Sequence, residues 1–202
     1  MELHKKLNEK PFPIMAYGNN VLRDKCSNVN LDSNIKSVSE KLRNTLTFAQ
    51  GIGLAAPQIN IPENIFIVDS KLMYEELSDH QRNKLFSGDK GIQEAFINAS
   101  IISESDDKWY EMEACLSIPG LNEPIERSWE IIIEYYDLDF NLNRKQYSGF
   151  TAKVIQHEYD HINGILFIDH LLPLKKKLLK NKLNLVKSGK IETDYPIKYL
   201  KY

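Results

Sequence analysis

The segment His157-Glu-Tyr-Asp-His161 constrains the fold most, because its chemistry requires an α-helix. On a helix, residues i and i+4 share a face, so both imidazoles can reach one metal ion. Glu158 stands beside them and can accept a proton from water that such a metal activates. We therefore expect a helix over 150–163, with Gly164 as its stop. The alternative is a chance match in a chain with five histidines.

A catalytic site of this kind needs a third protein ligand and one open position. In the peptidase pattern H-E-x-x-H-x-x-G-x-x-H the third histidine would stand at Phe167, and His170 has the wrong spacing. Few acids follow, so the third ligand is expected upstream. Cys115, among turn residues in the segment 113–120, is the best candidate, since a thiolate binds Fe or Zn strongly. Taken alone, a cysteine is more often a buried core residue, and Cys26 keeps that interpretation.

The glycine-rich stretch Gly51-Ile-Gly-Leu-Ala-Ala-Pro-Gln58 is the third segment with chemical content. Its glycines would let a substrate backbone come close, although glycines also serve ordinary turns. At its end, Gln58 offers an amide N–H₂ donor, which could stabilise an oxyanion.

The remaining pattern predicts an α+β fold, in which antiparallel β-sheets pack around a central metal-binding α-helix and a further helix follows near the C-terminus. Residues 1–202 are expected to form a single catalytic domain. Residues 71–87 read as a surface helix or a long excursion. The other expected elements are a helix over 33–50, capped by Asp32 or Ser33, a helix over 174–187, and strands over 65–68, 95–102, 129–136 and 140–147.

The three segments GIGLAAPQ, EACLS and HEYDH resemble, in the same order, the signature motifs of the peptide deformylases, G-x-G-x-A-A-x-Q, E-G-C-L-S and H-E-x-x-H. The resemblance runs from about residue 11 to 170. Ala114 departs from it, because the family usually has glycine there. We expect a negative φ at Ala114, so that the methyl group is harmless.

The resemblance implies removal of the N-terminal formyl group from formyl-methionine of newly made polypeptides, with release of formate. Cys115, His157 and His161 would bind the metal, and Glu158 would be general base and then general acid. The metal would be Fe(II) in cells, with Zn(II), Ni(II) or Co(II) also compatible with these ligands.

For the substrate, the resemblance implies that the Leu116 backbone N–H and the Gln58 side chain hold the oxyanion. Gly53 would pair its backbone with the peptide, as an added strand does. An apolar pocket would take the methionine side chain, with ordinary core packing as the alternative for its candidate residues. Those candidates are Ile52, Phe150 and Val154.

Two rival functions remain. A metallopeptidase would cleave between residues, and Phe167 in place of a third histidine argues against it. A non-catalytic homologue could keep the fold and bind the ribosome, but the intact set of Glu158, Gln58 and the three ligands argues against that.

The segment 172–190 has seven lysines and no acid. A helical stripe of Leu172, Leu179, Leu183 and Val186 would pack inward. The lysines then form either a solvated basic face or a site that docks on ribosomal RNA through its phosphates.

Composition excludes several classes. The net charge of -2 does not suit a general polyanion binder, and no run approaches the roughly 18 apolar residues that span a bilayer. Met1 to Pro13 has no apolar stretch typical of a secretory signal, and two cysteines suit a reducing compartment, so we expect a cytoplasmic protein. His4, His80 and His170 receive no role.

Overall fold

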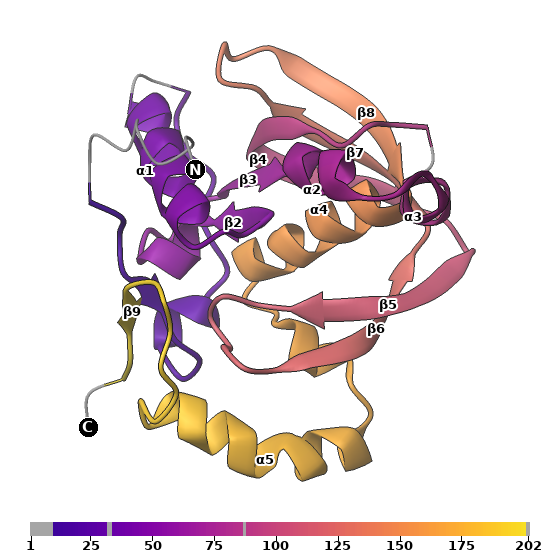
Figure 1. The fold of residues 1–202 in the computed structure, drawn as a ribbon. Helices are drawn as coiled ribbons and strands as arrows, with labels where there is room; N and C mark the ends of the chain where they lie inside the picture. Colours follow the sequence, from indigo (N-terminus) through magenta and orange to yellow (C-terminus); the bar gives the residue numbers. More distant parts are fainter. Residues whose placement is uncertain (1–9, 32–33, 87, 201–202) are drawn as a thin grey trace.

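The computed structural model describes residues 10–31, 34–86 and 88–200 (Figure 1). Its main feature is a five-stranded sheet of order β2-β3-β4-β7-β8, in which every neighbouring pair is antiparallel. The predicted mixture of helices and antiparallel sheets is confirmed. The strands of this sheet are β2 (Gly53–Ala55), β3 (Ile65–Asp69), β4 (Gln93–Glu104), β7 (Glu130–Tyr136) and β8 (Leu142–Ser148).

Two smaller pairs of strands complete the sheets. β5 (Lys108–Ala114) and β6 (Asn122–Ser128) form an antiparallel ribbon. β1 (Ile14–Met15) and β9 (Ile197–Lys198) pair in parallel. This parallel pair was not predicted, because only antiparallel sheets were expected. Parallel pairing is available here because the two strands lie far apart in the sequence and need no tight turn between them.

Helix α4 (Gly149–Ile162) lies between the five-stranded sheet and the β5-β6 ribbon (Figure 1). It contacts β2, β3 and β8 on one side and β6 on the other. Only Tyr159 and Asp160 of its residues are not buried, which is typical of a helix with packed neighbours on every side. Gly164 follows it with a φ of 73°, and a side chain there would collide with the backbone of Arg23. The predicted helix and its stop are therefore both present.

Helix α1 (Asn34–Phe48) packs on β2 and β3. The predicted caps Asp32 and Ser33 lie outside the described residues. Between β3 and β4 the chain forms two short helices, α2 (Lys71–Glu76) and α3 (Asp79–Leu85). Short 3₁₀ turns occur at Asn20–Leu22, Ala56–Ile59 and Phe167–His170.

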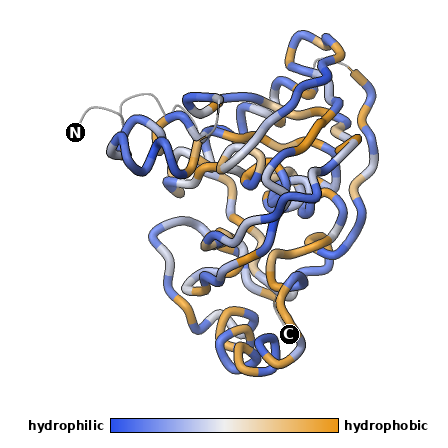
Figure 2. Tube along the Cα trace, turned by 90° about the vertical axis from the view of Figure 1, so that its right-hand side faces the viewer, coloured by the Kyte–Doolittle hydropathy of each residue, from blue (hydrophilic) through white to orange (hydrophobic). Residues whose placement is uncertain are grey.

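Helix α5 (Pro173–Lys187) lies apart from the five-stranded sheet (Figure 1) and packs in one cluster with Ile125 of β6. Blue and orange residues alternate around its turns in Figure 2. Leu179, Leu183 and Val186 are buried as predicted. Leu172 is 77% exposed, so its place in the buried stripe was wrong. The reason is that Leu172 precedes the helix in an extended conformation, which the following Pro173 favours.

Two strand predictions differ from the structure. The strand expected over 140–147 begins at Leu142, because Phe140 has a φ of 65° in the turn that joins β7 to β8. The β5-β6 ribbon was not predicted, since charged residues and Pro124 interrupt its apolar pattern. No helix among the described residues is long and apolar enough to cross a membrane.

Candidate metal centre and active site

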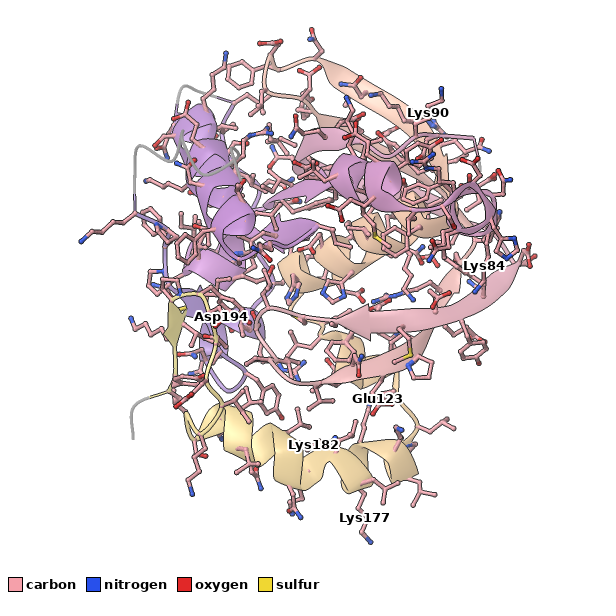
Figure 3. All side chains as sticks on the ribbon, viewed as in Figure 1. Lys84, Lys90, Glu123, Lys177, Lys182 and Asp194 are labelled. Atoms are coloured by element: carbon pink, nitrogen blue, oxygen red, sulfur yellow. The ribbon has the colours of Figure 1, made fainter. Side chains whose placement is uncertain are left out.

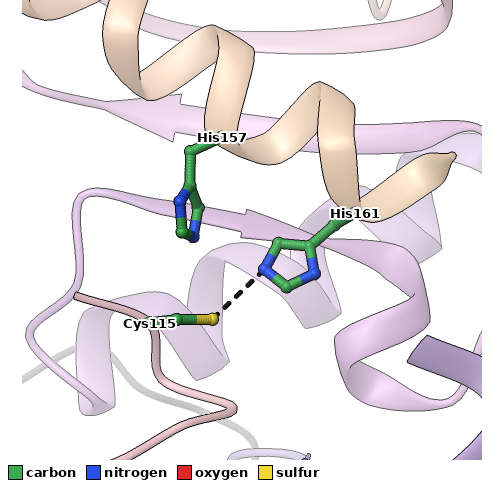
Figure 4. Close-up of side chains that lie close together, drawn as sticks. All are labelled: Cys115, His157 and His161. Atoms are coloured by element: carbon green, nitrogen blue, oxygen red, sulfur yellow. Dashed lines mark hydrogen bonds between the residues drawn. The ribbon is translucent and has the colours of Figure 1, made fainter. Parts of the chain in front are cut away.

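Cys115, His157 and His161 meet in the interior (Figure 4). The histidines lie one turn apart on α4, and Cys115 directly follows β5. The Cys115 Sγ lies 3.2 Å from the His161 Nε2, and ligand atoms from all three residues lie within 4.8 Å of one another. All three side chains are buried. The helix and the end of the ribbon thus assemble the set that the sequence suggested.

This donor set fits one divalent ion. Metal–sulfur and metal–nitrogen bonds of about 2.3 and 2.1 Å at tetrahedral angles place neighbouring donors roughly 3.5 Å apart. Burial by itself raises the pKa of the Cys115 thiol, but the imidazoles of His161 and His157 outweigh it and lower the pKa to about 5. A thiolate is the form that binds metal.

Glu113 contacts one of these three residues, and no role was predicted for it from the sequence. The His157 Nδ1 lies 2.9 Å from the Glu113 Oε2, and the Arg127 Nε donates to the Glu113 Oε1 at 2.8 Å. Burial opposes the charge on Glu113, but the bonds to His157 and Arg127 hold its pKa well below the usual range. Arg127 also donates to Asp160 at 2.6 Å, and His170 lies 2.7 Å from that same carboxylate.

Glu158 points toward the glycine-rich strand. It is 3% exposed, and its Oε2 has no hydrogen-bond partner among the described residues. Burial raises its pKa to about 7, against the lowering effect of the two imidazoles. A Cβ on Gly53 would lie 2.5 Å from the Glu158 Oε1. A side chain at position 53 would therefore displace this carboxylate from its present position. The sequence alone did not predict this constraint.

Gln58 presents its N–H₂ group toward Cys115. The Ala55 N–H donates to the Gln58 Oε1 at 2.8 Å, which fixes the orientation of the amide. The Gln58 Nε2 lies 3.2 Å from the Ser117 Oγ and 3.7 Å from the Cys115 Sγ. The donor predicted for an oxyanion therefore lies beside the candidate metal ligand Cys115.

A groove of about 1080 Å³ opens onto this centre. The predicted substrate residues Ile52, Gly53, Phe150 and Val154 line it. Phe150 and Val154 also belong to the hydrophobic core, so they pack in the core and line the groove at the same time. Helices α2 and α3 add Met73, Gln81, Lys84 and Leu85 to the wall.

Ala114, also in the groove wall, is exposed, and its φ is not positive. The expectation that alanine causes no backbone strain there is confirmed. Cys26 is buried in the core, as predicted, and burial raises the pKa of its thiol to about 11. His80 is exposed and His4 lies outside the described residues.

A buried Cys/His/His donor set beside a buried carboxylate, in the wall of a groove, is typical of a metal-dependent hydrolase. The family model "Polypeptide deformylase" matches residues 11–177. The chain belongs to the peptide deformylase family, whose enzymes remove the formyl group from new polypeptides.

Individual comparisons agree with this assignment. The chain is 41% identical to a peptide deformylase of Flavobacterium psychrophilum over 93% of this chain and 96% of that protein. It is 40% identical to a peptide deformylase of Christiangramia forsetii, over 93% of this chain and 95% of that protein. Among solved structures, peptide deformylase from Plasmodium falciparum has 34% identity and a TM-score of 0.74, over 87% of this chain and 95% of that one.

Proposed function

We propose that Cys115, His157 and His161 hold the single divalent ion of this deformylase, and that Glu158 transfers the proton. The observation that carries the proposal is the convergence of three buried ligand atoms within 4.8 Å, beside a carboxylate oxygen with no partner among the described residues. A divalent ion held there would act as a Lewis acid that activates water and polarises the formyl carbonyl.

Glu158 accepts one proton from the attacking water, whose oxygen bonds to the formyl carbon. The C–N bond of the formamide then breaks, and Glu158 gives the proton to the leaving amine. Formate and a free N-terminus result. A carboxyl group with a pKa near neutrality suits both steps, since it can lose and regain a proton at similar cost.

Gln58 and Leu116 would stabilise the negative charge that develops on the formyl oxygen. The Gln58 Nε2 is held beside Cys115 by its own bonds, and Leu116 is the next residue in the chain. Donors that are fixed before the reaction need no reorganisation when the charge forms.

The peptide would lie along β2, which is an edge strand of the five-stranded sheet. Gly53 would pair its backbone with the substrate, as in strand addition. The methionine side chain would enter the groove among Ile52, Phe150 and Val154.

Formate release from a formyl-Met tripeptide, measured anaerobically on protein of known metal content, tests this function. We propose Fe(II) as the ion in cells, with Zn(II), Ni(II) or Co(II) able to replace it. Glu158→Ala should keep the metal and lose turnover. Full activity of Glu158→Ala would contradict the mechanism, and cleavage between residues of the tripeptide would instead support a metallopeptidase.

We further propose that α5 docks on ribosomal RNA where nascent chains emerge, and that residues 1–202 act in the cytoplasm as one catalytic domain. Lys175 and Lys176 bind Glu123 and the Asp169 carbonyl, whereas Lys177 and Lys182 are exposed and Lys177 points away from the body (Figure 3). Exposed lysines on one helix suit phosphate contacts, whose strength falls with salt.

Co-sedimentation with ribosomes at two salt concentrations tests the docking. Lys177→Gln with Lys182→Gln should weaken binding and flatten its salt dependence, whereas Lys71→Gln with Lys90→Gln, which also removes two exposed lysines, should not. Equal binding by both pairs would contradict the proposal. Truncation before α5 is a poorer test, because it also removes core residues.

A further inference from the structure

The proposed mechanism gives no role to Ser117, which follows Leu116 in the chain. Its side chain is fully buried, at 0% exposure, and the residues that line the groove do not include it. The Ser117 Oγ nevertheless lies 3.2 Å from the Nε2 of Gln58, which does line the groove. Ser117 therefore contacts a proposed oxyanion donor from a position that the substrate does not reach.

The amide group of Gln58 has only one possible orientation. The Ala55 N–H donates to one end of the amide at 2.8 Å, and only an oxygen can accept that bond, so this end is the Oε1. The Nε2 must then face Ser117 and Cys115. It carries two hydrogens, and the hydroxyl oxygen of Ser117 accepts one of them. One N–H of Gln58 therefore remains for a further acceptor.

The remaining N–H of Gln58 lies on the side of the metal centre, since the Nε2 is 3.7 Å from the Cys115 Sγ. An amide group is planar, so one bond at each end fixes the direction of this N–H as well. Without the Ser117 hydroxyl, the group would be held at its Oε1 alone. Both N–H groups could then turn toward the Cys115 thiolate, because a charged acceptor forms the stronger hydrogen bond.

The turn 115–118 holds Ser117 in a fixed place. Its first three carbonyl groups each accept one hydrogen bond. In chain order, the donors are the Ile118 N–H at 2.9 Å, the Tyr195 hydroxyl at 2.9 Å and the Tyr17 N–H at 2.7 Å. Because Tyr17 and Tyr195 belong to distant parts of the chain, the turn is tied to two further segments. The Ser117 Oγ is thus a fixed point that can hold the Gln58 amide.

We propose that Ser117 is a positioning residue, whose hydroxyl fixes the Gln58 amide so that its second N–H is directed at the formyl oxygen. This inference rests on the proposed role of Gln58 in deformylation. A donor contributes most when its direction is fixed before charge develops. A Gln58 amide that can rotate therefore lowers kcat more than it changes substrate binding.

Ser117→Ala removes the acceptor and otherwise keeps the turn. We expect kcat on a formyl-Met tripeptide to fall about 5- to 20-fold, a fraction of the ~10²–10³-fold cost of losing a donor outright. KM should stay within about twofold, and the metal content should be unchanged. Unchanged kcat, or a change in KM alone, would overturn the inference.

Ser39→Ala is the matched control. Ser39 is a buried serine of α1, at 2% exposure, and its Oγ has no hydrogen-bond partner among the described residues. The two variants remove the same atom from a buried site, but only Ser117→Ala removes an acceptor from Gln58. Ser39→Ala should keep kcat within about twofold of the unmodified protein.

A double-mutant cycle with Gln58→Ala separates positioning from a general loss of structure. Gln58→Ala alone should lower kcat about 10²-fold. In this background Ser117→Ala should lower kcat by less than about twofold more, because no amide is left to position. A further loss of about 5- to 20-fold would show that the two residues act independently and would overturn the inference. Normal kcat in Gln58→Ala would also overturn it, while leaving deformylation itself intact.

The mobility of the Gln58 amide gives a second readout that needs no turnover. In the diamagnetic Zn(II) form, NMR relaxation of the Gln58 Nε2 should give an order parameter of about 0.85, and that of the exposed Gln146 one below about 0.6. Ser117→Ala should lower the value for Gln58, and Ser39→Ala should not. In the unmodified protein a rigid amide supports the inference and a mobile one overturns it, even if Ser117→Ala does not fold.

Failure of the proposed function would look different from failure of this inference. Absence of formate release by the unmodified, metal-loaded protein would contradict deformylation. The order parameters of Gln58 in the unmodified protein and in Ser117→Ala would then decide the positioning role by themselves.

Discussion

The Nδ1 of His157 lies 2.9 Å from the carboxylate of Glu113. Because this bond uses the Nδ1, the opposite nitrogen of the ring is left to face Cys115 and His161. A carboxylate behind a histidine ligand fixes the ring and raises its basicity. Arg127 donates to the same carboxylate, so the orientation of His157, a proposed metal ligand, depends on β5, β6 and α4 together.

Glu113→Gln should weaken metal binding about 10- to 100-fold, the usual cost of losing such a support. Competition with a chelator measures the affinity. Glu123→Gln is the matched control, because Glu123 pairs with Glu113 across the ribbon but binds Lys175 instead. Equal metal affinity in the two variants would show that Glu113 does not support the site. The melting temperature of both variants should be measured as well, because Glu113→Gln leaves the buried charge of Arg127 partly uncompensated and can lower stability.

Gly53→Ala should reduce kcat/KM about 100-fold or more, because the added Cβ would lie 2.5 Å from the Glu158 Oε1. The carboxylate must then move, and a displacement of about 1 Å can cost that much. The φ of Gly53 is not positive, so backbone strain is not the cause. Metal content should be retained, which separates this effect from loss of the ligands. Near-normal turnover by this variant would show that Glu158 need not keep its place.

Cys115→Ala should lose the metal and all measurable turnover, since two histidines leave the ligand set incomplete. Cys26→Ala is its control, because Cys26 is equally buried but lies in a different part of the core. It should keep the metal and lose only about 1 kcal/mol of stability from the vacated volume. Metal analysis and the melting temperature with and without a chelator measure both. Chelation should lower the melting temperature of the unmodified protein and of Cys26→Ala, but not that of Cys115→Ala.

Because Lys153 is a buried lysine, we expect the free energy of unfolding to depend on pH. It is 2% exposed on α4, its Nζ donates to the Glu111 carbonyl, and it lies 3.7 Å from Glu113. Burial lowers its pKa to about 8, and Arg127 adds to this, whereas Glu113 and Glu111 oppose it. The unfolded chain has a lysine pKa of about 10.4.

Between pH 8 and about 10.4 the unfolded state therefore binds more protons at this lysine, and the native state gains stability as the pH rises. Below pH 8, the free energy of unfolding of Lys153→Met should exceed that of the unmodified protein by the largest amount. Above pH 8, this difference should shrink by up to about 1.4 kcal/mol per pH unit. Denaturant unfolding at pH 7, 8, 9 and 10 measures the difference.

Lys145 serves as the control for this titration. Burial opposes its charge, but bonds to Tyr135 and Glu94 prevail and raise its pKa. A raised pKa contributes stability that is fully present below the unfolded pKa and is lost only at higher pH. The difference for Lys145→Met should therefore stay flat from pH 7 to 10. A flat profile for Lys153→Met as well would show that Lys153 is not desolvated in solution.

The sequence by itself determined the local features of this protein. Helical spacing predicted α4 and its stop at Gly164, and the buried face of α5 except for Leu172. The order of the three motifs indicated the family, which the comparisons confirmed. These features could be read because side-chain periodicity and glycine conformations are properties of short segments.

Only the tertiary structure decided which distant side chains meet. Glu113 lies 14 residues from Arg127 and 44 from His157, and Tyr195 lies 79 residues from Leu116. The collision that a side chain at position 53 would have with Glu158 likewise depends on how β2 lies against α4. No pattern in a single sequence encodes these contacts, because they arise from the packing of α4 between two sheets and from the pairing of β9 with β1.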